Sequence, residues 1–270
     1  MKEESKKLSA VVISENEEDV IEACLNSLCF CDEIILVDGG SKDRTIEIAS
    51  RNSIVRIINH SSSEGGIHFN KNLGAKEAKG EWILSIDADE VVNSKLADEI
   101  LNTINRAEFH AYYLKRKTFF LGKWIRHCGW WPGKVIRLWK KGHAEWPLEV
   151  HLTPSAKEPC GLLEESLEHY SYRSVNDWIR KAAHFSGCEA FEFKQKKELP
   201  NNLKLCYEIT LLPALTFIKK LLFQSAWRDG IHGIVIAGSA AFAVWLRGVK
   251  KWEMKITENV PNLGGRKGSL

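Results

Sequence analysis

The chain has 270 residues, of which 44% are hydrophobic and 27% charged. This is an ordinary globular composition, and it excludes general disorder. The formal net charge of +3 is too small for a typical nucleic-acid-binding protein, which would carry basic clusters with interleaved aromatic residues. We expect no nucleic-acid partner, and the mild positive excess fits anionic ligands or an anionic membrane surface.

The seven cysteines are odd in number and form no repeated C-x-x-C pair. This pattern favours free thiols in a reducing compartment over a disulfide framework or a zinc site. The charged N-terminal residues run directly into an apolar segment, so no signal peptide is visible. These features predict a cytoplasmic protein.

In residues 8–104, apolar runs alternate with segments of helical periodicity. The runs lack polar alternation, which is typical of strands buried on both faces. The expected strands are 8–14, 33–37, 54–58 and 82–86, and the expected helices are 19–28, 45–50, 68–78 and 94–104. This order predicts an α/β fold with a mostly parallel sheet and helices on both faces.

The pattern changes after residue 110. Short strands are expected at 111–115 and 135–139, and an amphipathic helix at 175–194. We therefore divide the chain into a sheet-forming domain at 1–165, a C-terminal helical part at 166–260 and a loose tail at 261–270.

Two apolar segments, 211–223 and 231–246, dominate the last third of the chain. The second segment is shorter than the ~20 apolar residues of a membrane-spanning helix. Its flanks carry Trp227, Arg228, Trp245 and Arg247, which is typical of segments anchored at a membrane interface. We expect membrane association, with a buried core helix of a soluble domain as the alternative.

The strongest local motif is Asp87-Ala88-Asp89, directly after the expected fourth strand. Two carboxylates at a strand end can present oxygens to one Mg²⁺ or Mn²⁺ ion, a class of ion that commonly bridges substrate phosphates. Asp89 could instead cap the following helix.

Two further strand ends carry polar residues, at Ser14 to Glu17 and at Asp38. Ligands bind at the carboxyl ends of strands in parallel sheets, so these residues should meet in one crevice. Capping of the helix that follows explains the first segment almost as well, and it is the preferred explanation for Asp43.

Together these motifs resemble the family 2 glycosyltransferases, which have the GT-A fold. The matching residues are Asn16-Glu17-Glu18, Val37-Asp38 with Ser41-Lys42-Asp43-Arg44-Thr45, and Asp87-Ala88-Asp89-Glu90. The segments 120–125 and 129–132, with Arg137-Leu138, resemble a WaaE-like subgroup that glucosylates the lipopolysaccharide core. The resemblance covers about residues 8–252.

The resemblance implies a nucleotide-diphosphate sugar donor, UDP-linked, and a divalent metal, Mg²⁺ or Mn²⁺. By position, Ser14, Glu17 and Asp38 would contact the nucleoside, and Lys71 the uridine or its phosphates. Two carboxylates complete the implied donor site. Asp87 would hold the ribose or a metal-bound water, and Asp89 would ligate the metal.

An inverting transfer needs a general base for the acceptor hydroxyl. The subgroup often carries Val-His-Glu in this region, whereas this chain has Leu152 where the glutamate would stand. The candidate bases are therefore Glu149, Glu145 and His151, with Glu149 preferred.

Trp130 and Trp131 could form an aromatic platform for the acceptor sugar, with packing against the sheet as an equal alternative. Arg137 could bind a diphosphate or an anionic acceptor, with a structural ion pair as the alternative.

The predicted activity is transfer of a hexose, glucose by resemblance, from a UDP-sugar to a glycolipid or lipopolysaccharide-core acceptor. The site of action would be the inner face of the cell membrane. The alternatives are a nucleotidyltransferase and a catalytically silent nucleotide-binding protein. No glycine occurs before residue 39, which counts against the phosphate loop of a nucleotidyltransferase. Leu152 is the one feature that favours the silent protein.

Overall fold

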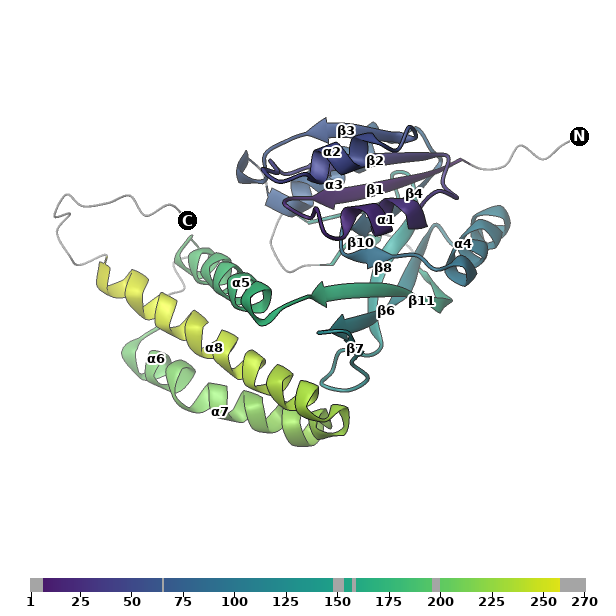
Figure 1. Cartoon of the computed structure of the whole chain (residues 1–270). Helices are drawn as coiled ribbons and strands as arrows, with labels where there is room; N and C mark the ends of the chain where they lie inside the picture. The colour runs from purple at the N-terminus through teal and green to yellow at the C-terminus, as the bar shows by residue number, and fades with distance from the viewer. Residues whose placement is uncertain (1–6, 65, 148–152, 157–158, 196–199, 258–270) are drawn as a thin grey trace, which may run out of the picture. The chain divides into compact units, whose positions relative to one another are not determined.

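The computed structural model describes residues 7–64, 66–147, 153–156, 159–195 and 200–257 (Figure 1). The chain divides into two compact units. The first comprises 1–124 and 130–171, and the second comprises 125–129 and 172–270. Ser171 ends the first unit, residue 165 lies inside a strand of the sheet, and residues 125–129 group with the C-terminal helices.

The first unit begins with a parallel half-sheet in the order β3-β2-β1-β4. These strands are β1 (Leu8–Ser14), β2 (Glu33–Asp38), β3 (Val55–Asn59) and β4 (Trp82–Asp87). β1 and β4 are almost entirely buried, as expected for apolar runs without polar alternation. The register aligns Ser14 with Asp38 and Ile13 with Asp87, so three strands end at one edge.

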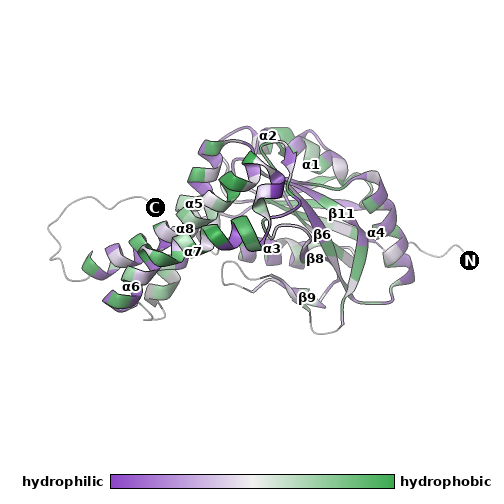
Figure 2. Ribbon diagram, turned by 90° about the horizontal axis from the view of Figure 1, so that it is seen from below, coloured by the Kyte–Doolittle hydropathy of each residue, from purple (hydrophilic) through white to green (hydrophobic). Residues whose placement is uncertain are grey.

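The other half of the sheet is antiparallel where the strand pairs are described, and it continues in the order β8-β6-β11-β5. These strands are β8 (Gly133–Lys140), β6 (Ala111–Phe120), β11 (Gly161–Tyr172) and β5 (Glu90–Val91). β8, β6 and β11 lie side by side in Figure 2. Short strands β7 (Lys123–Trp124), β9 (Ala144–Glu145) and β10 (Ser155–Ala156) complete the unit. The α/β fold is confirmed, and among the strand pairs that the structure describes, the parallel ones are β1-β2, β1-β4 and β2-β3.

Helices cover both faces of the parallel half. Side chains alternate along β1, so that Val12 packs with α1 (Ile21–Ser27) and α4 (Ser94–Arg106), whereas Val11 faces α3 (Gly66–Glu77). Gly74 brings α3 close to the sheet, because a Cβ there would lie 2.4 Å from Val11 Cγ1. The remaining helices of this unit are α2 (Thr45–Ser50) and the short η1 (Ser62–Glu64).

The second unit is helical in its described residues. It contains α5 (Val175–Gln195), α6 (Asn202–Ile209), α7 (Leu211–Ile218), η2 (Lys219–Phe223), η3 (Ala226–Asp229) and α8 (Ile231–Thr257). α8 packs against α5, α6 and α7. The predicted C-terminal helical part is confirmed. Within the described residues, α8 alone is long and apolar enough to cross a membrane by length and composition.

Candidate active site

The carboxyl ends of β1 and β2 bring Ser14 and Asp38 together. Both side chains are buried, and the Ser14 hydroxyl donates to Asp38 Oδ1 at 3.2 Å. The other oxygen of Asp38 accepts the amides of Gly40 and Ser41 at 2.9 and 2.8 Å. Gly40 has a φ of +108°, a conformation that favours glycine. Asp38 therefore shapes the turn in which it lies.

The loops after β1 and β2 are joined by paired hydrogen bonds. The backbone amide of Asn16 donates to Ser41 Oγ, and the side-chain oxygen of Asn16 accepts the Lys42 amide at 2.8 Å. The Glu17 amide donates to Thr45 Oγ1 at 2.8 Å. Asp43 accepts the amide of Thr45, the first residue of α2, which agrees with the preferred explanation that Asp43 serves the start of this helix. This network places Glu17 beside the same sheet edge as Asp38.

At the end of β4, Asp87 lies between two cations. Lys71 Nζ of α3 is 2.7 Å from Asp87 Oδ1, and Arg137 Nη2 of β8 is 2.5 Å from Asp87 Oδ2. Burial alone would raise the pKa of Asp87, but Arg137 and Lys71 hold that pKa well below its usual range. Burial also lowers the pKa of Lys71. Asp87 is therefore an ionised carboxylate held in a fixed position.

A second carboxylate completes this cluster. Glu90 is fully buried, accepts from Arg137 Nη2 at 2.6 Å, and also accepts the Asp87 amide at 2.9 Å. Trp146 covers the cations, with its ring centroid 3.8 Å from Lys71 Nζ and 5.5 Å from the Arg137 guanidinium carbon. The charges are paired, as buried charges must be.

Asp89 faces His169, a residue to which sequence analysis gave no role. β5 and β11 pair so that Glu90 aligns with His169, and this register puts His169 Nε2 3.6 Å from Asp89 Oδ1. The other ring nitrogen of His169 is 3.3 Å from Thr118 Oγ1, which orients the imidazole. No spacing in the sequence could have revealed this pair, because 80 positions separate the two residues and only the sheet register joins them.

Asp89 and His169 fit a divalent metal. Carboxylate oxygen and imidazole nitrogen suit ions such as Mn²⁺, and the half-buried pair lies at the edge where Asp38 and Asp87 end their strands. Within the described residues, no group of three or more His, Cys, Asp or Glu side chains is arranged around one point. Mg²⁺-like ions are commonly held by one or two protein ligands together with substrate phosphates, so two ligands suffice for a metal that binds with its substrate.

The candidate bases lie around residue 146. Glu145 is exposed on β9, whereas Glu149 and His151 lie outside the described residues. α3 holds the chain at Trp146, just before Glu149 and His151, because Asn72 accepts the Trp146 amide at 3.0 Å and donates to the Trp146 carbonyl at 2.8 Å. His68 Nδ1 lies 2.7 Å from the Pro147 carbonyl oxygen. The same helix that supplies Lys71 thus fixes the approach to this segment.

The proposed acceptor residues fall into two environments. Trp130 and Trp131 are half-buried, and they pack edge-to-face on Phe120 and Trp124. Arg137 is only 1% exposed and is paired with both Asp87 and Glu90, which favours the structural ion pair that sequence analysis kept as its alternative.

Comparison with known proteins identifies the family. Residues 9–152, just over half of the chain, match the family model described as glycosyl transferase family 2. An uncharacterized glycosyltransferase of Rickettsia bellii is 27% identical over 94% of this chain and 89% of its own length. The lipopolysaccharide core biosynthesis glycosyltransferase LpsC of Rhizobium meliloti is 24% identical over 95% of this chain and 96% of its own length.

Among solved structures, S. aureus TarS 1–349 in complex with UDP has a TM-score of 0.49 at 17% identity, covering 93% of this chain and 92% of that one. The family match over half of the chain is decisive. The chain belongs to glycosyl transferase family 2, and it is a glycosyltransferase. The resemblance found in the strand-end motifs is confirmed.

Proposed function

We propose that this enzyme transfers a hexose, glucose in the first instance, from a UDP-sugar to the saccharide of a lipid-linked acceptor, with inversion at the anomeric carbon. The observation that carries the proposal is the convergence of Asp38, Asp87 and Asp89 at one sheet edge beside His169. LpsC, which matches along nearly its full length, is named for lipopolysaccharide core biosynthesis. This supports a core saccharide as the acceptor.

In the proposed donor site, Ser14, Glu17 and Asp38 bind the nucleoside at the ends of β1 and β2. Asp87 is held rigid by Lys71 and Arg137, so that one carboxylate edge stays oriented toward the donor ribose without reorganisation. This geometry supports a binding role for Asp87 better than a share in the metal site.

Asp89 and His169 would hold the divalent metal. When bound, the ion would neutralise charge on the leaving diphosphate as a Lewis acid. Thr118 orients the His169 ring through Nδ1, so that Nε2 would be the atom available to the metal.

A base from the segment around residues 145–151 takes the proton from the acceptor hydroxyl. The hydroxyl oxygen then attacks the anomeric carbon on the face opposite the diphosphate, the bond from that carbon to the diphosphate oxygen breaks, and UDP leaves, so that the configuration is inverted. Glu149 stays the preferred base, with Glu145 and His151 as alternatives. Trp130 and Trp131 are proposed to stack on the acceptor sugar. The lipid anchor of the acceptor would place the reaction at the inner face of the cell membrane.

The test is the variant Asp89→Asn. Loss of an outer-shell partner of a metal already costs 10–100-fold, so loss of a ligand should reduce UDP release from UDP-glucose by more than about 100-fold. Asp98→Asn on the exposed face of α4 is the matched control and should retain activity. Calorimetric titration of UDP with Mn²⁺ gives a second readout, in which Asp89→Asn and His169→Gln should both lose the metal-dependent part of UDP affinity. Unchanged turnover in Asp89→Asn would remove its metal role.

A further inference from the structure

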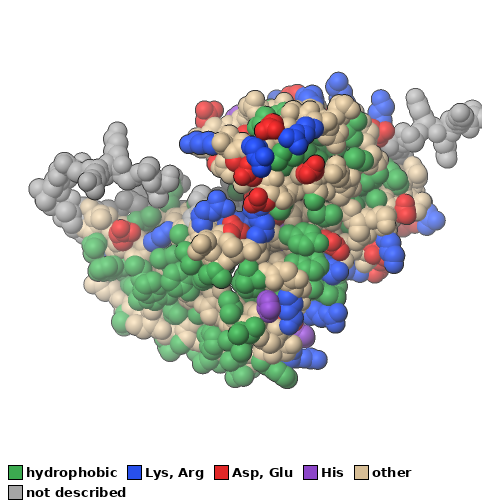
Figure 3. All heavy atoms as spheres, in the orientation of Figure 1, with side chains coloured by type: hydrophobic (Ala, Val, Ile, Leu, Met, Phe, Trp, Pro, Cys, Tyr) green, Lys and Arg blue, Asp and Glu red, His purple; other side chains and the backbone are tan. Residues whose placement is uncertain are grey.

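The turn between α7 and α8 carries four large apolar side chains on the surface. Leu222, Phe223, Trp227 and Ile231 are 61%, 84%, 59% and 73% exposed, and we call them the apolar tip. Figure 3 shows hydrophobic side chains gathered over the helical unit. Contiguous exposed apolar surface of this kind marks an interaction site or a membrane contact.

The tip is not made of residues displaced from the core of the unit. Ala226 and Asp229, which alternate with the tip residues, are 0% and 3% exposed, and Ile236 of α8 is 2% exposed. Gly233 lies so close to Ala226 that a Cβ would be 1.8 Å from the Ala226 carbonyl oxygen. The turn is therefore tightly folded, and its apolar residues are held outward.

The charges around the tip are basic. Residues 219–231, which carry the tip, contain Lys219, Lys220 and Arg228 and one acid, Asp229, and this acid is buried against His127 and the amide of Arg126. Lys219 and Arg228 are exposed next to the tip residues. Apolar side chains bordered by tryptophan and basic residues are the pattern of interfacial anchors on anionic lipid.

Ion pairs hold α8 within the helical unit. If α8 spanned a membrane, the charged side chains of these pairs would lie in lipid. Lys251 Nζ is 2.9 Å from Glu208 Oε2 of α6, and both side chains are buried. Arg247 Nη1 is 2.8 Å from Glu189 Oε2 of α5. Gly248 permits close packing on α6, because a Cβ there would lie 3.0 Å from Ile209 Cγ1. Charged groups within a span are costly, so α8 is better suited to stay packed in its unit.

We propose that the apolar tip inserts into the headgroup region of an anionic bilayer as an interfacial anchor, while α8 remains a packed helix and does not span the membrane. The inference rests on the proposed function in one respect, since a lipid-linked acceptor requires the enzyme at a membrane surface.

The experiment is co-sedimentation of the full chain with vesicles of equal parts phosphatidylcholine and phosphatidylglycerol. The double variant Phe223→Ser/Trp227→Ser should lose at least about tenfold in vesicle affinity, because it removes two interfacial aromatic anchors. Leu203→Ser is the matched control, since Leu203 is 82% exposed on α6 in the same unit, and it should bind as the wild type does. Circular dichroism should give the same melting temperature for all three proteins.

The proposal would be overturned by equal binding of the double variant or by equal loss in Leu203→Ser. It would also be overturned by retention of the wild type in membranes after alkaline carbonate extraction, which would indicate a span. A dimer that the double variant dissociates, without vesicle binding by the wild type, would assign the tip to a second copy and also overturn it. UDP release without vesicles is measured in parallel. Vesicle binding without UDP release would leave the anchor intact and refute the proposed function.

Discussion

At the scale of single residues, the cluster around Asp87 combines two buried cations and two carboxylates. Arg137 is the common partner of Asp87 and Glu90, and β8 brings it from a position far along the chain. The low pKa of Asp87 and the raised pKa of Arg137 have the same cause. Burial disfavours each charged form, but the neighbouring opposite charges favour it more strongly.

Replacement of Arg137 by Met should therefore be costly. It leaves Asp87 with Lys71 alone and removes the closest partner of Glu90, and breaking a buried pair in this way costs about 3–5 kcal/mol. We expect a loss of that size in the free energy of unfolding from urea denaturation.

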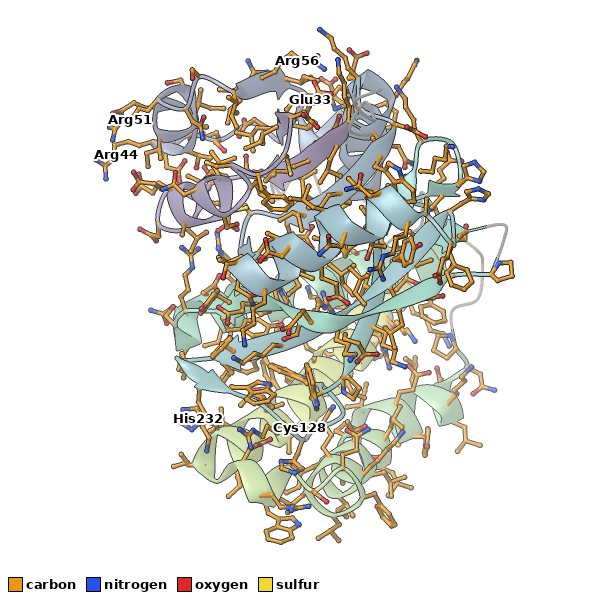
Figure 4. The ribbon with its side chains drawn as sticks, turned by 90° about the vertical axis from the view of Figure 1, so that its right-hand side faces the viewer. Glu33, Arg44, Arg51, Arg56, Cys128 and His232 are labelled. Atoms are coloured by element: carbon orange, nitrogen blue, oxygen red, sulfur yellow. The ribbon has the colours of Figure 1, made fainter. Side chains whose placement is uncertain are left out.

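The control is Arg51→Met. Arg51 pairs with Glu47 at 2.7 Å, but these side chains are 61% and 57% exposed, and Figure 4 shows Arg51 pointing outward. An exposed pair of this kind contributes about 0–1 kcal/mol. Equal losses in the two variants would mean that the Asp87 cluster adds no stability beyond a surface ion pair.

At the scale of elements, the loop at residues 125–129 is held within the helical unit by one acid. Asp229 at the end of η3 accepts the amide of His127 at 2.8 Å and contacts His127 Nδ1 at 3.1 Å. The Cys128 amide donates to the Gln224 carbonyl, and Lys220 donates to the Cys128 carbonyl, both at 2.9 Å. Figure 4 labels Cys128 in this loop. These bonds hold residues 125–129 to the turn that precedes α8 within the helical unit.

The variant Asp229→Asn should loosen this connection. Hydrogen bonds to a charged group are worth about 1.5–3 kcal/mol, and we expect a loss of about 2 kcal/mol. Burial acts to raise the pKa of Asp229, but the bonds from His127 and Arg126 hold it below its ordinary value. A depressed folded-state pKa gives stability that is present above the unfolded pKa, about 3.9, and that is lost as the pH falls through the folded value.

Thermal melts across the acid range measure both effects. The wild type should lose melting temperature below about pH 4, and Asp229→Asn should lose less over that interval after starting lower at neutral pH. Glu253→Gln, an exposed acid of α8, should follow the wild type. Parallel acid profiles for wild type and Asp229→Asn would contradict the assignment of the acid-sensitive stability to Asp229.

At the scale of the whole molecule, the proposed donor and metal are expected to bind together. The proposed metal ligands among the described residues are Asp89 and His169, and a substrate diphosphate would supply the remaining oxygens. A thermal shift assay with UDP and Mn²⁺, separately and combined, should therefore give a large shift only for the combination. At a hundredfold excess over Kd, the stabilisation is about 2.7 kcal/mol, which corresponds to roughly 5–10 °C in Tm.

Other nucleotides are the comparison in the same assay. A larger shift with GDP or ADP and Mn²⁺ would mean that this nucleotide, and not UDP, is carried by the donor. If UDP gave the same shift in melting temperature with and without Mn²⁺, the proposed metal role of Asp89 and His169 would be refuted, but the proposed nucleoside site would not.

Much of the first unit followed from local patterns in the sequence. Strand 8–14 was predicted with its exact bounds, and the other three parallel strands within one residue at each end, because buried parallel strands are continuous apolar runs bounded by polar residues. The same reasoning located Asp38 and Asp87 at strand ends. The family followed from these strand-end motifs, which lie within the region that matches the family model.

The tertiary structure decided what local patterns could not encode. The pairing of β5 with β11 brought His169 to Asp89. The pairing of β8 with β4 and the packing of α3 on the sheet enclosed Asp87 between Lys71 and Arg137, and the packing of α8 in its unit left the apolar tip outside. The sequence determined which side chains end each strand, since periodicity and burial are local properties. Contacts between distant residues depend on sheet register and helix packing. These are properties of the folded chain, and local patterns in the sequence do not reveal them.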